Sequence, residues 1–499
     1  MNRKLCVSIS LLVFLCIQIK AQDYNFNLQE IIQRAKDQSP AAKQAETQRN
    51  NSYWQYRTFK SNYNPQVTLT GNAPGYSNQI TGVQQPDGSV VYRTLNQTYS
   101  NAALGLQQPI AATGGNISVN TNLFQFHNFI PNPGDPATTW QSTLFNLQLQ
   151  QPLFAFNPLR WDKKVQPIIY EQSKRSYVED MEFVSRIAVD RYFGVLTAQI
   201  NLQIAQFNLA NNDTIYQIEQ GRYNIGTTSE DKLLQVQLQL LRSRQEVAQA
   251  KLDFRNNVLR LRNYIGLNEL SSSAEIELTL PEDIPIFEIS EEDALRYAKQ
   301  NRSQYISFER DRLIAEQAVA RAKGQRYQVN MAASYGVNGT SSSLSDISAN
   351  PNNQGIASIQ FSVPIVSWGR NKSRLQTALA NEQLTQYTIA QEELNFDQEI
   401  ITQVRQFDML QLQLEITKTA AEVAQKRYDV AQNRYLIGKI DITNLNIALT
   451  EKDTARRSYT DALQAYWRAY YDLRRLTLYD FENKTLLYNP ELEQEVTEY

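Results

Sequence analysis

The chain has 499 residues, roughly three ordinary domains by length, and 42% of them are hydrophobic, enough to bury sizeable cores. Lys and Arg total 49 against 51 Asp and Glu, so the net charge of −2 gives no electrostatic reason to expect a nucleic-acid partner. One His and two Cys leave few of the residues that build metal sites, thiol nucleophiles and general bases. The composition therefore argues against an enzyme.

The first 21 residues are predicted to be an export signal. Arg3 and Lys4 precede an apolar run over residues 5–19, and Ala21 offers a small residue for cleavage. The mature chain is then expected to begin at residue 22.

Both cysteines, Cys6 and Cys16, lie in this signal, so the mature protein is expected to be free of cysteine and disulfides. Lipid attachment at Cys16 stays open as an alternative, although Leu15 stands where lipoprotein signals carry a small residue. After the signal, no run approaches the roughly 20 apolar residues of a membrane-spanning helix. A span, if present, must be a β-barrel.

The most informative feature of the chain is an internal duplication. Arg-Tyr-Asn-Ile-Gly at 222–226 matches Arg-Tyr-Leu-Ile-Gly at 434–438 at an offset of 212 residues, and Pro152 meets Pro364 at the same offset. Each unit has the order helix, alternating segment, turn-rich loop, alternating segment, long helix, tight turn, long helix. The predicted division is a signal at 1–21; a first repeat at 22–288 with a β-hairpin region at 65–152 and long helices at 158–224 and 227–265; a second repeat at 289–479 with a β-hairpin at 327–366 and long helices at 369–436 and 441–477; and a tail at 480–499.

The long helices show helical start signals and heptad spacing. Asn157 and Pro158 are predicted as N-cap and first helical residue of a helix of about 100 Å, with a bend expected at Pro167. An apolar residue recurs every seven positions, or at 4-3 spacing in the second unit, which indicates antiparallel coiled coils. These positions are Leu233, Leu240, Val247, Phe254 and Leu261, and Tyr459, Leu463, Tyr466, Tyr470 and Leu473.

The alternating segments favour β-strands with one face to lipid and one to water. Apolar residues alternate with polar ones between turn signals such as 85–88 and 350–353. Aromatic residues cluster at the segment ends, as in an interfacial girdle or, alternatively, a sandwich core: Phe124, Phe126, Phe129, Trp140, Phe154, Phe156, Trp161 and Trp368. Because four or six strands are too few to close a barrel, the chain is expected to oligomerise if they span a membrane.

In these features the chain resembles the TolC-like outer membrane efflux proteins. The resemblance covers about 27–478 and rests on the duplicated order and two motifs: a Pro-containing strand end before a long helix, at 151–154 and 363–365, and Arg-Tyr-x-Ile-Gly between paired helices. It implies a mixed α and β fold in which three copies share a transmembrane β-barrel and their coiled-coil helices form a periplasmic α-barrel. It places the protein in the cell outer membrane, in contact with its lipid and extending into the periplasm, with a periplasmic adaptor and an inner-membrane transporter as partners.

The resemblance also implies two kinds of site. The helical tips would dock the adaptor through Arg222, Tyr223, Gly226, Arg434, Tyr435 and Gly438. The periplasmic gate candidates are Tyr435, Asp441, Asn444 and Ile447. In the family the tunnel narrows at rings of carboxylates, but the matching positions here are Asn444 and Ile447. A carboxylate ring is therefore not expected, with Asp441 as the nearest acid.

The first β region is longer than the second. Leu-Gln-Gln-Pro-Ile at 106–110 nearly repeats Leu-Gln-Gln-Pro-Leu at 149–153, which suggests an extra hairpin. This hairpin would enlarge a trimeric barrel from twelve strands to eighteen or fold outside the membrane. We expect twelve strands, four from each chain.

The sequence offers few other candidates for a catalytic, metal or cofactor site. His127 is expected to have a structural or solvent role, and the acidic run 291–293 is expected to form a capping box after Ser290. No phosphate-binding loop and no ligand-spaced carboxylate cluster is recognisable, so no cofactor or metal is expected.

Two functions remain at this point. The first is a channel of a tripartite efflux or type I secretion system that conducts cargo passively; the alternative is a non-conducting coiled-coil structural or adhesion protein of the cell envelope. Strand segments in both repeats favour the channel. The cargo and the pump family cannot be read from the sequence.

Overall fold

A computed structural model describes residues 24–131, 134–267, 276–281 and 283–489. The predicted signal, its two cysteines and the last ten residues of the predicted tail lie outside these residues. The described helices are α1 (Leu28–Gln38), α2 (Pro40–Ser61), α3 (Pro158–Asn224), α4 (Glu230–Tyr264), α5 (Glu291–Asn301), α6 (Ser303–Gly324), α7 (Arg370–Leu436) and α8 (Ile442–Thr477). The described strands are β1 (Tyr24–Phe26), β2 (Gln66–Gln84), β3 (Val90–Ile110), β4 (Gly115–Asn128), β5 (Thr138–Leu153), β6 (Ile276–Leu278), β7 (Gln328–Ser341), β8 (Asn352–Ser362), β9 (Tyr479–Asp480) and β10 (Thr485–Leu486). Within these ranges, no helix is both long and apolar enough to cross a membrane.

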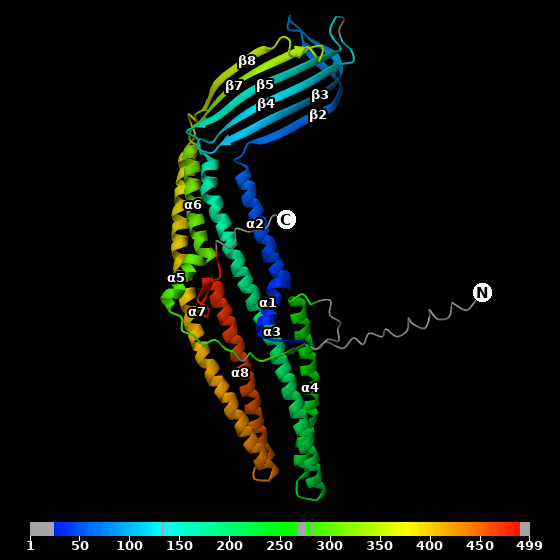
Figure 1. Cartoon of the computed structure of the whole chain (residues 1–499), viewed down its shortest axis with the longest axis vertical. Coiled ribbons are helices and arrows are strands. Elements are labelled where there is room, and N and C mark those ends of the chain that lie inside the picture. The colour runs from blue at the N-terminus through cyan, green and yellow to red at the C-terminus, as the bar shows by residue number, and fades with distance from the viewer. Residues whose placement is uncertain (1–23, 132–133, 268–275, 282, 490–499) are drawn as a thin grey trace, which may run out of the picture. The chain divides into compact units, whose positions relative to one another are not determined.

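Two helices dominate the chain. α3 and α7 have 67 residues each, which corresponds to about 100 Å per helix. At the start of α3 the side chain of Asn157 accepts a hydrogen bond from the backbone N–H of Arg160 at 3.2 Å, so the predicted N-cap is confirmed. α3 continues through Pro167 as one helix. α3 with α4 and α7 with α8 each form a helical hairpin (Figure 1).

Six strands form one antiparallel sheet in the order β2-β3-β4-β5-β7-β8 (Figure 1). β3 pairs with β4 without interruption from Gln97 opposite Asn128 to Ile110 opposite Gly115. The extra hairpin is therefore part of the sheet, which has six strands in one chain where four were expected. The extra hairpin, β2 with β3, continues the sheet because its backbone groups pair along the whole of β4.

The repeated Leu-Gln-Gln-Pro segments end β3 and β5 with the same local structure. The Gln108 side-chain amide donates to the carbonyl of Pro109 at 2.8 Å, and the Gln151 amide donates to the carbonyl of Pro152 at 2.9 Å. In each pair, an amide group satisfies a carbonyl at the point where proline, which has no N–H, limits further pairing.

The described chain forms two compact units, each built from separate stretches of sequence. One contains the six-stranded sheet, with residues 50–173 and 306–393. The other contains the helical tips, with the described residues of 1–49, 174–305 and 394–499.

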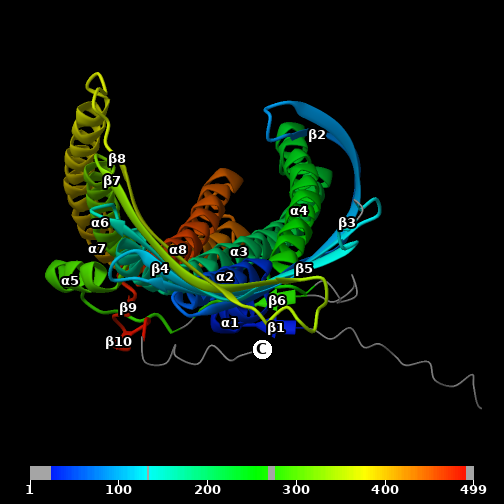
Figure 2. The ribbon, with the colours of Figure 1, turned by 90° about the horizontal axis from the view of Figure 1, so that it is seen from above.

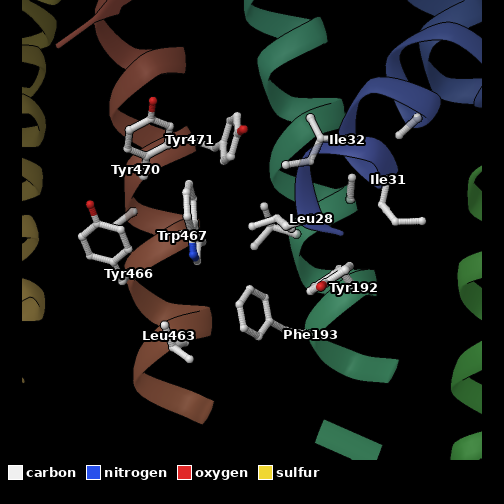
Figure 3. Packing of buried hydrophobic residues seen from close by; sticks show 14 of the residues in the cluster. Leu28, Ile31, Ile32, Tyr192, Phe193, Leu463, Tyr466, Trp467, Tyr470 and Tyr471 are labelled. Atoms are coloured by element: carbon white, nitrogen blue, oxygen red, sulfur yellow. The ribbon is translucent and has the colours of Figure 1, made fainter. Parts of the chain in front are cut away.

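The main core of the second unit lies between α1, α3 and α8. Phe193 of α3, Leu28 of α1 and Trp467 of α8 point toward one another (Figure 3). The heptad residues Leu463, Tyr466, Tyr470 and Leu473 are buried in the same cluster, as the 4-3 spacing predicts.

A buried carboxylate joins three elements beside this core. Glu182 of α3 accepts hydrogen bonds from Lys36 of α1 at 2.7 Å and from Arg474 of α8 at 2.9 Å, and Arg474 also binds Asp480. Burial opposes ionisation of Glu182, but the charges of Lys36 and Arg474 outweigh it and hold its pKa below the usual range. The site fastens α1 and the end of α8 to α3.

The two short helices that open the repeats begin differently. α1 has a full capping box, in which Glu30 N–H donates to Asn27 at 2.8 Å and Asn27 N–H donates to Glu30 at 3.0 Å. The capping box expected after Ser290 is wrong, because the Ser290 side chain makes no cap hydrogen bond. Glu291 instead pairs with Arg405 at 2.7 Å.

Candidate functional site

The six-stranded sheet has one apolar and one polar face. Register and alternation place one row of partners along all six strands on the apolar face: Val67, Leu106, Val119, Leu147, Tyr335 and Gly355. The neighbouring row lies on the polar face: Gln66, Gln107, Ser118, Gln148, Ser334 and, at the end of the row, Ile356. The sheet curves across its width (Figure 2).

The apolar face is open. Val67 is 63% exposed, Leu69 75% and Phe361 76%. So much exposed aliphatic and aromatic surface on one face is typical of a site that contacts lipid or another protein.

Aromatic residues do not all lie on the apolar face. In the uninterrupted pairing of β3 with β4, Phe124 and Phe126 share the face of Ser118, and the Phe124 ring stacks on Tyr99 with centroids 6.4 Å apart. These two residues therefore depart from a girdle on the apolar face. Phe154 and Trp368, at the strand-to-helix junctions, are 86% and 96% exposed.

The repeated Arg-Tyr-x-Ile-Gly motif forms a helix C-terminus with a left-handed glycine. Gly226 has a φ of 75° and Gly438 a φ of 74°. In the first turn, Gly226 N–H donates to Tyr223 and Thr227 N–H donates to Arg222, both at 2.9 Å. The second turn repeats both bonds at matching positions, which is the Schellman pattern.

The two copies of the motif have different surroundings. Tyr435 is 3% exposed and its hydroxyl donates to Glu219 at 3.1 Å, whereas Tyr223 is 40% exposed. Arg222 pairs with the same carboxylate at 2.6 Å and lies over the Tyr435 ring, while Arg434 is exposed. Burial, together with Glu219, raises the pKa of Tyr435 to about 12.

Glu219 was not among the tip residues predicted from the sequence. Its position three residues before Arg222 on a helix is the spacing of an ion pair, and this signal was available in the sequence.

A small core joins the four long helices near the tips. It contains residues from α3, α4, α7 and α8: Ile215, Val236, Tyr428, Tyr435, Leu445 and Leu449. Beside it, the buried Lys452 ammonium lies 4.2 Å from the centroid of the Phe207 ring and 4.4 Å from that of Tyr428. Burial lowers the pKa of Lys452, against the charge of Asp453. The pair of Lys452 and Asp453 was not among the sites predicted from the sequence.

Among the gate candidates, the structure brings Asp441 and Asn444 together. Asp441 is the N-cap of α8 and accepts from the backbone N–H and side-chain amide of Asn444 at 2.9 and 2.8 Å. Asn444 is exposed and Ile447 is 46% exposed, whereas Tyr435 is buried in the core near the tips.

The described ranges contain no group of three or more His, Cys, Asp or Glu residues placed to hold a metal ion. His127 Nδ1 lies 2.9 Å from the Thr138 hydroxyl, and its ring meets Phe129 edge to face.

A sheet with an exposed apolar face, combined with paired long helices, defines a fold class found in outer-membrane channels. The model of the outer membrane efflux protein family matches residues 135–267 and 327–477. The chain belongs to this outer membrane efflux protein family, whose TolC-like members the sequence motifs resemble.

Solved structures share the fold. The Campylobacter jejuni CmeC outer membrane channel is 16% identical, with a TM-score of 0.64 over 90% of this chain and 85% of that one. The outer membrane protein VceC of Vibrio cholerae is 15% identical, with a TM-score of 0.61 over 90% and 95%. The open-state Neisseria gonorrhoeae MtrE outer membrane channel is 14% identical, with a TM-score of 0.58 over 90% and 88%. A comparison with curated proteins found no match.

Proposed function

We propose that three copies of this chain form an outer-membrane channel that receives cargo from a periplasmic adaptor and an inner-membrane transporter and conducts it passively to the exterior. The observation that carries the proposal is the two-faced sheet. Its apolar row suits lipid, and its row of Gln and Ser suits a water-filled interior. Six strands are fewer than the smallest single-chain barrels need, so neighbouring copies complete the wall.

The helical tips supply the proposed adaptor-docking surface. Arg222, Tyr223 and Gly226 form one turn, and Arg434, Tyr435 and Gly438 the other. Apolar side chains are exposed at both turns, Ile225 at 74% and Ile437 at 66%, and can be covered by a partner.

We further propose that the periplasmic gate is formed by Tyr435, Asp441, Asn444 and Ile447. Tyr435 is fixed through Glu219, and Asp441 is engaged as a helix cap, which leaves Asn444 and Ile447 as the exposed members. The repeats at 22–288 and 289–479 each contribute one helical hairpin.

Fractionation and electrophoresis test the channel proposal. The protein is expected in the outer membrane and should migrate as a trimer when mildly treated and as a monomer after boiling. A soluble periplasmic species would contradict the channel and favour the structural or adhesion protein.

Charge reversal tests docking. Arg222→Glu and Arg434→Glu leave both left-handed glycines in place, so the trimer should assemble while capture of the cognate adaptor falls. Gly226→Val and Gly438→Val should reduce capture through the strained turn. If both Arg→Glu variants bind the adaptor as the parent does, these arginines do not contribute to docking.

A further inference from the structure

The two edge strands of the sheet are open and uncharged. Among the residues that the structure describes, β2 and β8 each have a neighbouring strand on one side only, and neither strand contains Asp, Glu, Lys or Arg. Proteins usually protect exposed edges with charges, because an unpaired row of N–H and C=O groups pairs with another strand. These edges are suited to be paired.

The direction of the edge strands fits a second copy of the chain. β2 begins after α2 and β8 ends before α7, so a β8 placed beside β2 of another copy runs antiparallel to it. This continues the alternation of the whole sheet. Pro74 lacks an N–H, so the pairing segment of β2 is Gln66–Asn72.

The faces also match across such an interface. Val67 and Leu69 lie on the apolar face of β2 near its α2 end, and Ile359 and Phe361 lie on the apolar face of β8 near its α7 end. Joining the edges therefore continues both faces from copy to copy.

The β2–β3 hairpin is fixed within the sheet. Tyr63, just before β2, donates to the carbonyl of Leu159 in α3 at 2.8 Å, and Gln108 donates to the carbonyl of Tyr63 at 2.9 Å. The β3–β4 turn is held by Asn157, whose amide donates to Ala111 at 2.8 Å. The hairpin is thus tied to the residues that lead into α3.

Resting on the proposed trimeric channel, we propose that β2 of each copy pairs with β8 of the next and closes an eighteen-stranded barrel. With a strand spacing of about 4.8 Å and a tilt of about 40°, such a ring is roughly 36 Å across between backbones, against roughly 24 Å for twelve strands. The outer mouth is then a wide vestibule, lined mainly by Gln, Asn, Ser and Thr and by the aromatic residues Tyr99, Phe124 and Phe126 of the same face. It has room for larger cargo than a twelve-stranded mouth.

Paired cysteines on the polar face test this interface. Thr68→Cys or Thr70→Cys on β2 is combined with Ser358→Cys or Gln360→Cys on β8, so that four double variants cover the neighbouring registers. The assembled protein is treated with an oxidant or a short bis-maleimide and then boiled. Covalent dimers and trimers are expected in place of the monomer. The control is Asn330→Cys with Gln360→Cys, because these two residues are partners within one chain. This pair should react without forming covalent dimers or trimers.

The competing arrangement has its own variant. If the β2–β3 hairpin left the sheet, β4 would become the edge, and Asn120→Cys would cross-link to Ser358→Cys or Gln360→Cys of another copy. Three results would overturn the eighteen-stranded barrel. They are a cross-link from Asn120→Cys to another copy, β2–β8 cross-links that leave the protein at monomer mass, and no β2–β8 cross-link while the control pair reacts. Absence of a heat-sensitive trimer in the parent protein would instead contradict the proposed function itself.

Discussion

Tyr223 and Tyr435 show how much a residue's role depends on what surrounds it. Both occupy the same position of a Schellman turn, two residues before the helix cap. Only Tyr435 is buried and bonded to Glu219, because the small core near the tips packs around one turn and leaves Tyr223 at the surface.

Tyr435→Phe should destabilise its tip, whereas Tyr223→Phe should have little effect. Loss of the buried hydroxyl bond costs about 1 kcal/mol, which corresponds to roughly fivefold faster local hydrogen exchange. Exchange of peptides that cover 425–450 measures it. Equal effects of the two substitutions would show that the bond to Glu219 adds nothing.

Glu182→Gln should destabilise the core between α1, α3 and α8 by about 3 kcal/mol, because Lys36 and Arg474 lose their shared partner in a buried site. The pKa of Glu182 is depressed in the folded chain, so its ionised form stabilises the fold at neutral pH. This stabilisation declines as the pH falls below the usual glutamate value of about 4.3 toward the folded pKa.

Thermal melting in detergent at pH 7 and near pH 3 measures this effect. The difference between parent and Glu182→Gln should be smaller near pH 3 than at pH 7, because the stabilisation by the ionised carboxylate declines below the usual glutamate pKa. Glu292→Gln, at an exposed position of α5, is the matched control. A difference that does not change with pH would contradict the role of the carboxylate charge.

At the scale of elements, the two repeats use different means to begin similar helices. α1 starts with reciprocal hydrogen bonds between Asn27 and Glu30. α5 starts at Ser290 without a side-chain bond and relies on acidic residues in its first turn, one of which is held by Arg405.

Asn27→Ala should therefore cost about 1 kcal/mol of helix stability, while Ser290→Ala should cost only a few tenths. Hydrogen exchange at the first turns of α1 and α5 compares the two within equivalent elements. A larger loss at Ser290 would indicate a cap bond that the structure does not contain.

At the scale of the whole molecule, the proposed gate has no acid side chain at the two positions that the sequence resemblance matches to the family's carboxylate ring. Asn444 and Ile447 occupy them, and the Asp441 carboxylate already accepts two hydrogen bonds. Divalent cations added from the periplasmic side should therefore block single-channel current only weakly.

Strong block that disappears in Asp441→Asn would show that the helix cap also serves as the ring. Strong block that persists in this variant would place the cation site elsewhere in the channel.

Much of the architecture follows from local rules in the sequence. Period-2 alternation predicted the strands, the Asn157-Pro158 pair located the start of α3, and heptad spacing located the buried face of α8. Each of these signals acts between residues close in the chain, where backbone sterics and hydrogen bonding determine the conformation.

Tertiary structure decided the features that depend on residues distant in sequence. The extra hairpin of β2 and β3 belongs to the sheet because β3 pairs with β4. Tyr435 differs from Tyr223 because its hydroxyl donates to Glu219 of another helix. A strand's alternation shows that it has two faces but not which strand it adjoins, and a motif shows a turn but not what packs over it. The sequence by itself therefore determined the elements and the family, and long-range pairing and burial decided the width of the sheet and the partners of the tip residues.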